Sequence, residues 1–100
     1  MFALEITDAA EYDLDRITDY LGITLANPQA ALSLLDEMER LCEELGSNPS
    51  VFPLCAADNL AAMGYHKAIL ESYIVVFEIE GNTVRVLRVF HSSENYTNKL

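Results

Sequence analysis

The sequence is poor in basic residues. It has 6 Lys and Arg against 16 Asp and Glu, which gives a formal net charge of −10 at pH 7. A charge of this sign disfavours non-specific binding to nucleic acid and to an anionic membrane, because both would repel the chain. A local basic patch could still bind an anion. The total charge therefore weakens a nucleic-acid function without excluding one.

Long apolar runs and a cysteine framework are also missing. No segment approaches the ~20 apolar residues of a membrane-spanning helix, and the acidic opening MFALEITDAAEYD does not resemble a signal peptide. We therefore expect a cytoplasmic protein without a membrane partner. Cys42 and Cys55 match neither a disulfide framework nor a metal motif. The acidic residues show no spacing for a convergent metal site, so no metal or cofactor is expected.

The composition supports a single domain with a real core. The 100 residues are 51% hydrophobic, and no internal repeat or low-complexity segment divides them. Charge is distributed unevenly along the chain. Residues 8–44 contain ten acids and only Arg16 and Arg40, whereas residues 64–100 contain four acids, four Lys or Arg, and both His. Chemistry with an anion is therefore expected in the second half.

The first half predicts a strand followed by two helices. Alternation of apolar residues predicts a strand over residues 2–7, after which Asp8 is the expected N-cap, with Glu11 completing a capping box. The helix that follows is expected to end before Asn27, because a residue preceding proline is disfavoured in the helical region. Its apolar stripe is predicted to contain Ala10, Leu14, Ile17, Leu21 and Leu25. Its solvated face is predicted to contain Glu11, Asp13, Asp15, Arg16 and Asp19.

The second helix has clear start and stop signals. Asn27 is the expected N-cap and Pro28 the first helical residue, while Gly46 is the expected left-handed C-cap. The link between the two helices is so short that they must form an antiparallel hairpin. The core stripe of the second helix is predicted to contain Ala31, Leu34, Leu35, Met38, Leu41, Cys42 and Leu45.

The second half predicts a loop and three strands. Residues 47–63 are expected to form a loop anchored by Val51, Phe52 and Leu54, with one helical turn within residues 58–63. Strands are expected over residues 65–70, 73–80 and 83–91, the last two joined by a Gly81-Asn82 hairpin. The order β-α-α-β-β-β predicts an α+β domain. In it, a helical hairpin packs on one face of a mostly antiparallel four-stranded sheet, and the opposite face is free to bind a partner.

Four segments carry a resemblance to a known family: DLDRITDYLGITLANPQAALSLLDEMERLCEEL, NPSVFPL, GYHKAILESYIVVFEIEGNTVRVLRVFH and ENYTNKL. Their order and spacing resemble the RelE/ParE superfamily of toxins from type II toxin–antitoxin modules, in its plasmid-stabilisation branch. The family pattern includes Asn-Pro between the helices, a Gly-Tyr-Arg-Lys strand start and a last strand that ends in His. The resemblance covers nearly all of the 100 residues.

The resemblance implies a cognate antitoxin as partner and leaves three functions open. The first is a ribosome-dependent, metal-independent mRNA endoribonuclease that inhibits translation. The second is a ParE-like inhibitor that binds DNA gyrase and breaks no bond itself. The third is an inactive toxin-fold protein that only binds its antitoxin.

The ribonuclease function requires a base for the ribose 2′-hydroxyl, a cation for the phosphorane charge and an acid for the leaving oxygen. His66 stands where the family has Arg, and Glu94 stands at a second family Arg position, so two fixed cations are lost. The resemblance assigns candidate catalytic roles to His66, Lys67, Arg88, His91 and Tyr96.

Strand alternation limits how these candidates can meet. His66 shares a strand face with Ala68, and Lys67 lies on the other face. In the last strand, Arg88 and His91 fall on opposite faces. They can line one pocket only if a bulge intervenes or if His91 lies beyond the strand end.

Overall fold

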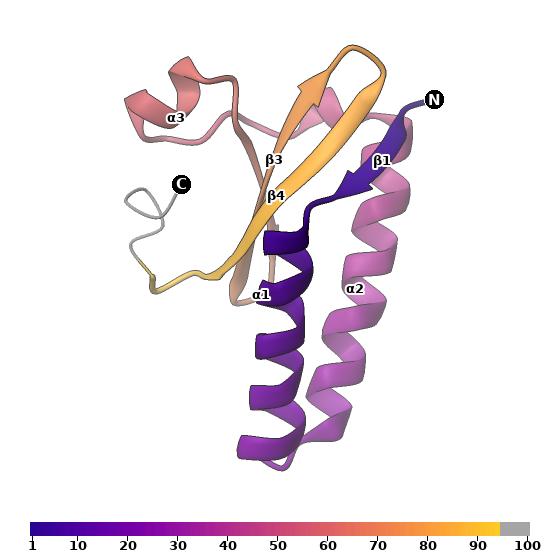
Figure 1. Ribbon diagram of the computed structural model, residues 1–100, viewed down its shortest axis with the longest axis vertical. Coiled ribbons are helices and arrows are strands. Elements are labelled where there is room, and N and C mark those ends of the chain that lie inside the picture. Colours follow the sequence, from indigo (N-terminus) through magenta and orange to yellow (C-terminus); the bar gives the residue numbers. More distant parts are fainter. Residues whose placement is uncertain (95–100) are drawn as a thin grey trace.

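The computed structural model describes residues 1–94 and has the predicted α+β architecture (Figure 1). The chain runs through β1 (Ala3–Ile6), α1 (Asp8–Asp19), α2 (Pro28–Ser47), α3 (Asp58–Ala62), β2 (His66–Leu70), β3 (Tyr73–Glu80) and β4 (Thr83–His91). The sheet order is β1-β4-β3-β2, in which β1 is parallel to β4 and the other pairs are antiparallel. Figure 1 shows α1 and α2 side by side, extending beyond the sheet at their joined ends.

The N-terminus of α1 is capped by Thr7. Thr7 Oγ1 accepts a hydrogen bond from the Ala10 amide at 3.2 Å and donates one to the Leu87 carbonyl at 2.9 Å. Asp8 is already the first helical residue, so the prediction of Asp8 as N-cap is wrong by one position. Thr7 is the better cap here because one hydroxyl satisfies a helix amide and also ties the helix start to β4.

The end of α1 widens into a π-helical turn over Tyr20–Thr24. The Leu25 amide donates to the Tyr20 carbonyl at 2.9 Å, a bond that spans five residues instead of four. The wider turn shifts the apolar stripe out of phase, and Leu25 is 52% exposed instead of joining the core. The predicted start of α2 is confirmed, because Asn27 Oδ1 accepts from the Ala30 amide at 3.2 Å.

Gly46 lies inside α2, which continues to Ser47. Only Gly64 and Gly81 among the described glycines have positive φ angles, so the prediction of Gly46 as a left-handed cap is wrong. The Phe2 amide donates to the Gly46 carbonyl at 2.8 Å. The start of β1 therefore satisfies a carbonyl near the helix end, a task that a left-handed cap performs in other helices.

The main core lies between the helical hairpin and one face of the sheet. Leu34, Met38, Leu41 and Leu45 of α2 are buried there, as the stripe predicts, whereas Leu35 is 44% exposed. Full burial of a side chain of this size stabilises the fold by about 2 kcal/mol. The sheet contributes Ala68, Leu70, Val75, Phe77, Val84, Val86 and Val89 to this core.

The opposite face of the sheet carries a second, smaller core. Cys55 and Leu60, from the loop and α3, are buried against Ile74, Val76 and Phe90. The prediction that this face is free is therefore wrong over this cluster. Two of the three predicted loop anchors are also wrong, because Val51 and Leu54 are 64% and 46% exposed. Phe52 is the correct one, and its ring packs edge-on against Phe77.

A β-bulge in β4 interrupts the strand alternation. Val76 lies opposite Arg88 and Phe77 lies opposite Val86, so Leu87 is an extra residue on β4. The bulge places both Val86 and Val89 on the helix-covered face. In residues 1–94, no helix is long and apolar enough to cross a membrane.

Candidate functional site

The site is built at the edge of β4, at the point where β1 ends. Strand β1 pairs with β4 only as far as Val86. Beyond it, the Thr7 amide donates to the Val86 carbonyl at 3.1 Å, and Asp13 Oδ2 accepts from the Val89 amide at 2.9 Å. Helix α1 therefore replaces a strand partner along the remaining edge.

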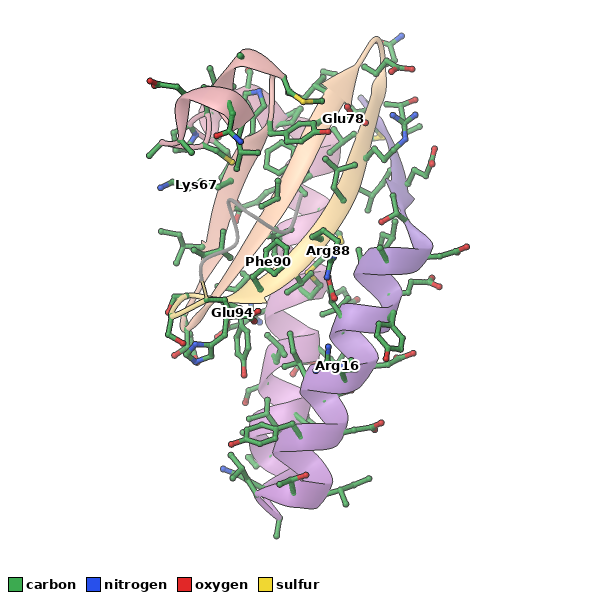
Figure 2. The ribbon with its side chains drawn as sticks, turned by 60° about the vertical axis from the view of Figure 1, so that its left-hand side comes forward. Arg16, Lys67, Glu78, Arg88, Phe90 and Glu94 are labelled. Carbon is green, nitrogen blue, oxygen red and sulfur yellow. The ribbon has the colours of Figure 1, made fainter. Side chains whose placement is uncertain are left out.

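Asp13 also forms a two-bond ion pair with Arg88. Arg88 Nε donates to Asp13 Oδ2 at 2.7 Å, and a terminal guanidinium nitrogen donates to Oδ1 at 3.0 Å. Figure 2 shows the Arg88 side chain directed towards α1. Asp13 is only 5% exposed, so the prediction that it lies on a solvated face is wrong. The hydrogen bond with Asp13 raises the pKa of Arg88. Arg88 is thus a fixed cation whose charge is balanced within the fold.

A cavity of about 410 Å³ lies between α1 and the end of β4. A second cavity, of about 510 Å³, lies nearer the helix–helix turn, and Leu21, Leu25 and Ala30 are among the residues that line it. We refer to the two cavities together as the α1–β4 groove. Tyr20, Tyr73 and His91 line both cavities, so the two cavities are adjacent.

The middle of the groove is aromatic. The His91 ring packs edge-on against Tyr73, with 5.4 Å between the ring centroids, and His91 Nδ1 lies 2.7 Å from Ser93 Oγ. Burial, and then the proximity of Tyr20, raises the pKa of Tyr73. Its phenol therefore stays protonated at neutral pH and can donate a hydrogen bond to a ligand.

Of the five predicted site residues, Arg88 and His91 line the groove. They meet although they fall on opposite faces of β4, because the groove lies at the strand edge. The bulge foreseen as one route to this arrangement is present, but it precedes Arg88 and shifts the residues around it. Tyr96 lies outside the described residues 1–94.

His66 and Lys67 lie away from the groove. The His66 ring stacks on Phe77 at 5.2 Å, and its Nδ1 lies 2.8 Å from the Phe52 carbonyl oxygen, within the helix-covered side. Lys67 lies on the other face, and Val76 of β3 separates it from Arg88. Figure 2 shows the Lys67 side chain pointing away from Arg88 and α1.

Asp13, Arg16, Tyr20 and Tyr73 are among the groove residues that sequence reasoning missed. The first three follow one another at spacings of three and four, which places them on one side of α1. That stripe of polar and aromatic residues is the sequence pattern that indicates the site. It could not be distinguished from an ordinary solvated helix face, because acidic residues surround it. In the described part of the chain, no cluster of three His, Cys, Asp or Glu residues could hold a metal ion.

The helical hairpin packed on a four-stranded mixed sheet matches the fold of ParE and RelE toxins. Residues 4–96 match the family described as ParE toxin of type II toxin-antitoxin system, parDE. The chain belongs to this family, which confirms the resemblance inferred from its sequence. No curated protein sequence matches the chain.

Two solved structures share the fold at low sequence identity. A chain from the chromosomal ParDE toxin–antitoxin system of P. aeruginosa has a TM-score of 0.73 and 22% identity, over 91% of this chain and 96% of that one. A chain from the RelBE2 toxin–antitoxin complex of Mycobacterium tuberculosis has a TM-score of 0.63 and 20% identity, over 93% of each chain. The arrangement of helices and strands is therefore similar to that of these two chains.

Proposed function

We propose that the protein is a toxin that acts by binding DNA gyrase, without cleaving RNA, and that a cognate antitoxin keeps it inactive. Membership of the ParE family supports the gyrase target, because ParE-like toxins are the binding members of the superfamily. The two solved structures come from toxin–antitoxin systems, which supports the antitoxin partner. Since gyrase acts on bacterial chromosomal DNA, the proposal places the protein in the cytoplasm.

The observation that carries the proposal is the dispersal of the residues needed for phosphodiester chemistry. His66 is stacked on Phe77, Lys67 points away from the groove, and Arg88 is bonded to Asp13. Cleavage through a 2′-hydroxyl requires a base, an acid and a cation within hydrogen-bond reach of one phosphate. The described residues do not present such a set, so a binding mechanism fits the geometry better.

The charge balance of β4 supports the same conclusion. Arg85 Nε bonds Glu5 at 3.1 Å and its terminal nitrogen bonds Glu78 at 2.8 Å, and Arg88 bonds Asp13. Both arginines of the strand are therefore already neutralised by carboxylates. With a net charge of −10, the chain is poorly suited to hold a polyanion.

The test compares two activities of the purified protein. We expect it to inhibit the supercoiling of relaxed plasmid DNA by purified gyrase, and to leave messenger RNA intact in a reconstituted translation reaction. In cells, induction should switch on a DNA-damage reporter before amino-acid incorporation falls. Co-expression of the antitoxin encoded beside the toxin gene should prevent both the reporter signal and the later fall in amino-acid incorporation.

The variant His91→Ala separates the mechanisms. His91 is exposed at the end of β4, so its removal should leave the fold intact. A ribonuclease that uses His91 would lose cleavage in this variant, whereas the proposed function predicts no cleavage by either protein. Cleaved transcripts with unaffected gyrase would overturn the proposal. If neither target responds and the antitoxin still binds, the protein is the inactive toxin-fold protein instead.

A further inference from the structure

Arg16 is the one groove arginine without a carboxylate partner among residues 1–94. Arg88 is held by Asp13, whereas Arg16 takes part in no ion pair of the described residues. Its guanidinium carbon lies 5.8 Å from the centroid of the Tyr12 ring, and the side chain is exposed at the groove wall. Figure 2 shows Arg16 on the stretch of α1 below the Arg88 contact. One end of the groove therefore offers a single available cation.

The other end of the groove offers apolar and aromatic surface. Tyr20 and Leu25 are each 52% exposed, and Leu21 and Leu34 line the cavity beside them. The π-helical turn produces this surface, because it displaces Leu25 from the core stripe. Tyrosine and bulky aliphatic side chains around a concave surface are typical of protein-binding sites.

The acids around the groove exclude a polyanion. Glu94 lines the cavity at the end of β4, and Glu71 lines the second cavity, nearer the helix–helix turn. A phosphate backbone that followed the groove would meet a carboxylate in each cavity, whereas a single carboxylate at Arg16 would not.

We propose that the α1–β4 groove binds a protein segment in which one Asp or Glu stands next to bulky apolar residues. The carboxylate pairs with Arg16, and the apolar side chains pack on Tyr20, Leu21 and Leu25. Two adjacent cavities of about 410 and 510 Å³ suit an extended segment of several side chains. This inference rests on the proposed function only in that a toxin acting by binding needs such a surface.

The experiment uses a random-peptide phage library selected on the intact protein, so it does not depend on gyrase. We expect the enriched peptides to share an Asp or Glu beside Leu, Ile or Phe. A synthetic copy of an enriched peptide, labelled and followed by fluorescence anisotropy, should bind Arg16→Gln about tenfold more weakly, the loss expected for one charge-assisted pair. Replacement of the acid by its amide in the peptide should cost the same factor, and the two changes together should cost no more than either alone.

Arg40→Gln is the matched control, because Arg40 is also an exposed helix arginine without an ion pair in the described structure and lies outside the groove. Its peptide affinity should equal that of the wild-type protein. Enrichment of basic peptides, equal affinity of Arg16→Gln, or preferential binding of a single-stranded oligonucleotide would each overturn the inference. Gyrase inhibition is measured separately, so a toxin that acts on another target could fail the proposed function and still pass this test.

Discussion

Asp13 and Arg88 lie 75 residues apart in the chain and form a two-bond ion pair that closes the edge of β4. The same carboxylate accepts the Val89 amide at 2.9 Å. One side chain of α1 thus balances a strand arginine and satisfies a backbone donor that no strand covers. Because Asp13 is buried, all three groups depend on one another for their hydrogen bonds.

Replacement of Asp13 by Ala should lower the free energy of unfolding by about 3 kcal/mol, because it removes the carboxylate that accepts hydrogen bonds from Arg88 and from the Val89 amide. The partial exposure of Arg88, 28% of its side chain, keeps the loss below that of a fully buried pair. Urea unfolding followed by circular dichroism measures it. Asp15→Ala, at an exposed position of the same helix, should change stability by less than about 0.5 kcal/mol. Equal midpoints for the two variants would contradict the structural role of Asp13.

Thr7→Ala should cost about 1–2 kcal/mol of stability, because the hydroxyl caps α1 and also bonds the Leu87 carbonyl. Asp8→Ala should cost less, because Asp8 only interacts favourably with the positive end of the helix. Thermal unfolding of the two variants at one pH ranks the positions. A larger loss for Asp8→Ala would instead restore Asp8 as the cap.

Gly46→Ala should stabilise the protein by roughly 0.5–1 kcal/mol, because Gly46 lies within α2 and alanine is the better helix former. An added Cβ would approach the Phe2 carbonyl oxygen at 3.8 Å, an ordinary contact. Gly81→Ala is the opposite case, since Gly81 has a φ of 59° that only glycine adopts without strain. It should destabilise the hairpin by about 1 kcal/mol. Chemical unfolding of both variants measures whether the free energy of unfolding rises for Gly46→Ala and falls for Gly81→Ala.

Glu37 should make the stability depend on pH. Its pKa is raised above the ordinary 4.5, mainly by a hydrogen bond with Glu71, and to a lesser extent by burial and by the charge of Glu71. The folded protein therefore holds this proton more tightly than the unfolded chain does. The stability that the pair contributes is present below pH 4.5 and is lost as the pH rises through the raised pKa.

Glu71→Gln should flatten this part of the stability profile, because an amide removes the negative charge that repels ionised Glu37. At neutral pH the variant should be at least as stable as the wild-type protein. Unfolding midpoints measured from pH 4 to pH 7 check the shape of the profile. Glu39→Gln, an exposed change on the same helix, is the control, and its unfolding midpoint should depend on pH as that of the wild-type protein does. If Glu71→Gln leaves the pH dependence of the unfolding midpoint unchanged, the carboxyl groups of Glu37 and Glu71 do not interact.

The order and type of the long elements could be predicted from the sequence because they depend on local patterns. The stripe of Leu34, Met38, Leu41 and Leu45 requires a helix with one buried face, and Asn27-Pro28 marks where that helix begins. Gly81-Asn82 between two alternating runs requires a hairpin. These signals act over a few residues, so they are readable before any tertiary contact is known.

The predicted caps failed where a distant segment competes with a local signal. Thr7 replaces Asp8 because the Leu87 carbonyl is within its reach, and Gly46 stays helical because Phe2 satisfies its carbonyl. In each case the deciding contact comes from a residue at least 40 positions away, and a local sequence pattern does not contain that information.

The sequence by itself determined the main elements of this protein, which are a helical hairpin and a mostly antiparallel four-stranded sheet, and the family to which the chain belongs. Only the tertiary structure decided the composition of the groove. Strand alternation depends on the backbone alone. The charge balance of Arg88 depends instead on the position of Asp13 on α1. The bulge at Leu87 determines which sheet face each neighbouring residue of β4 occupies. Charges and aromatic rings come together through contacts between elements far apart in the chain, and such contacts leave no period in the sequence.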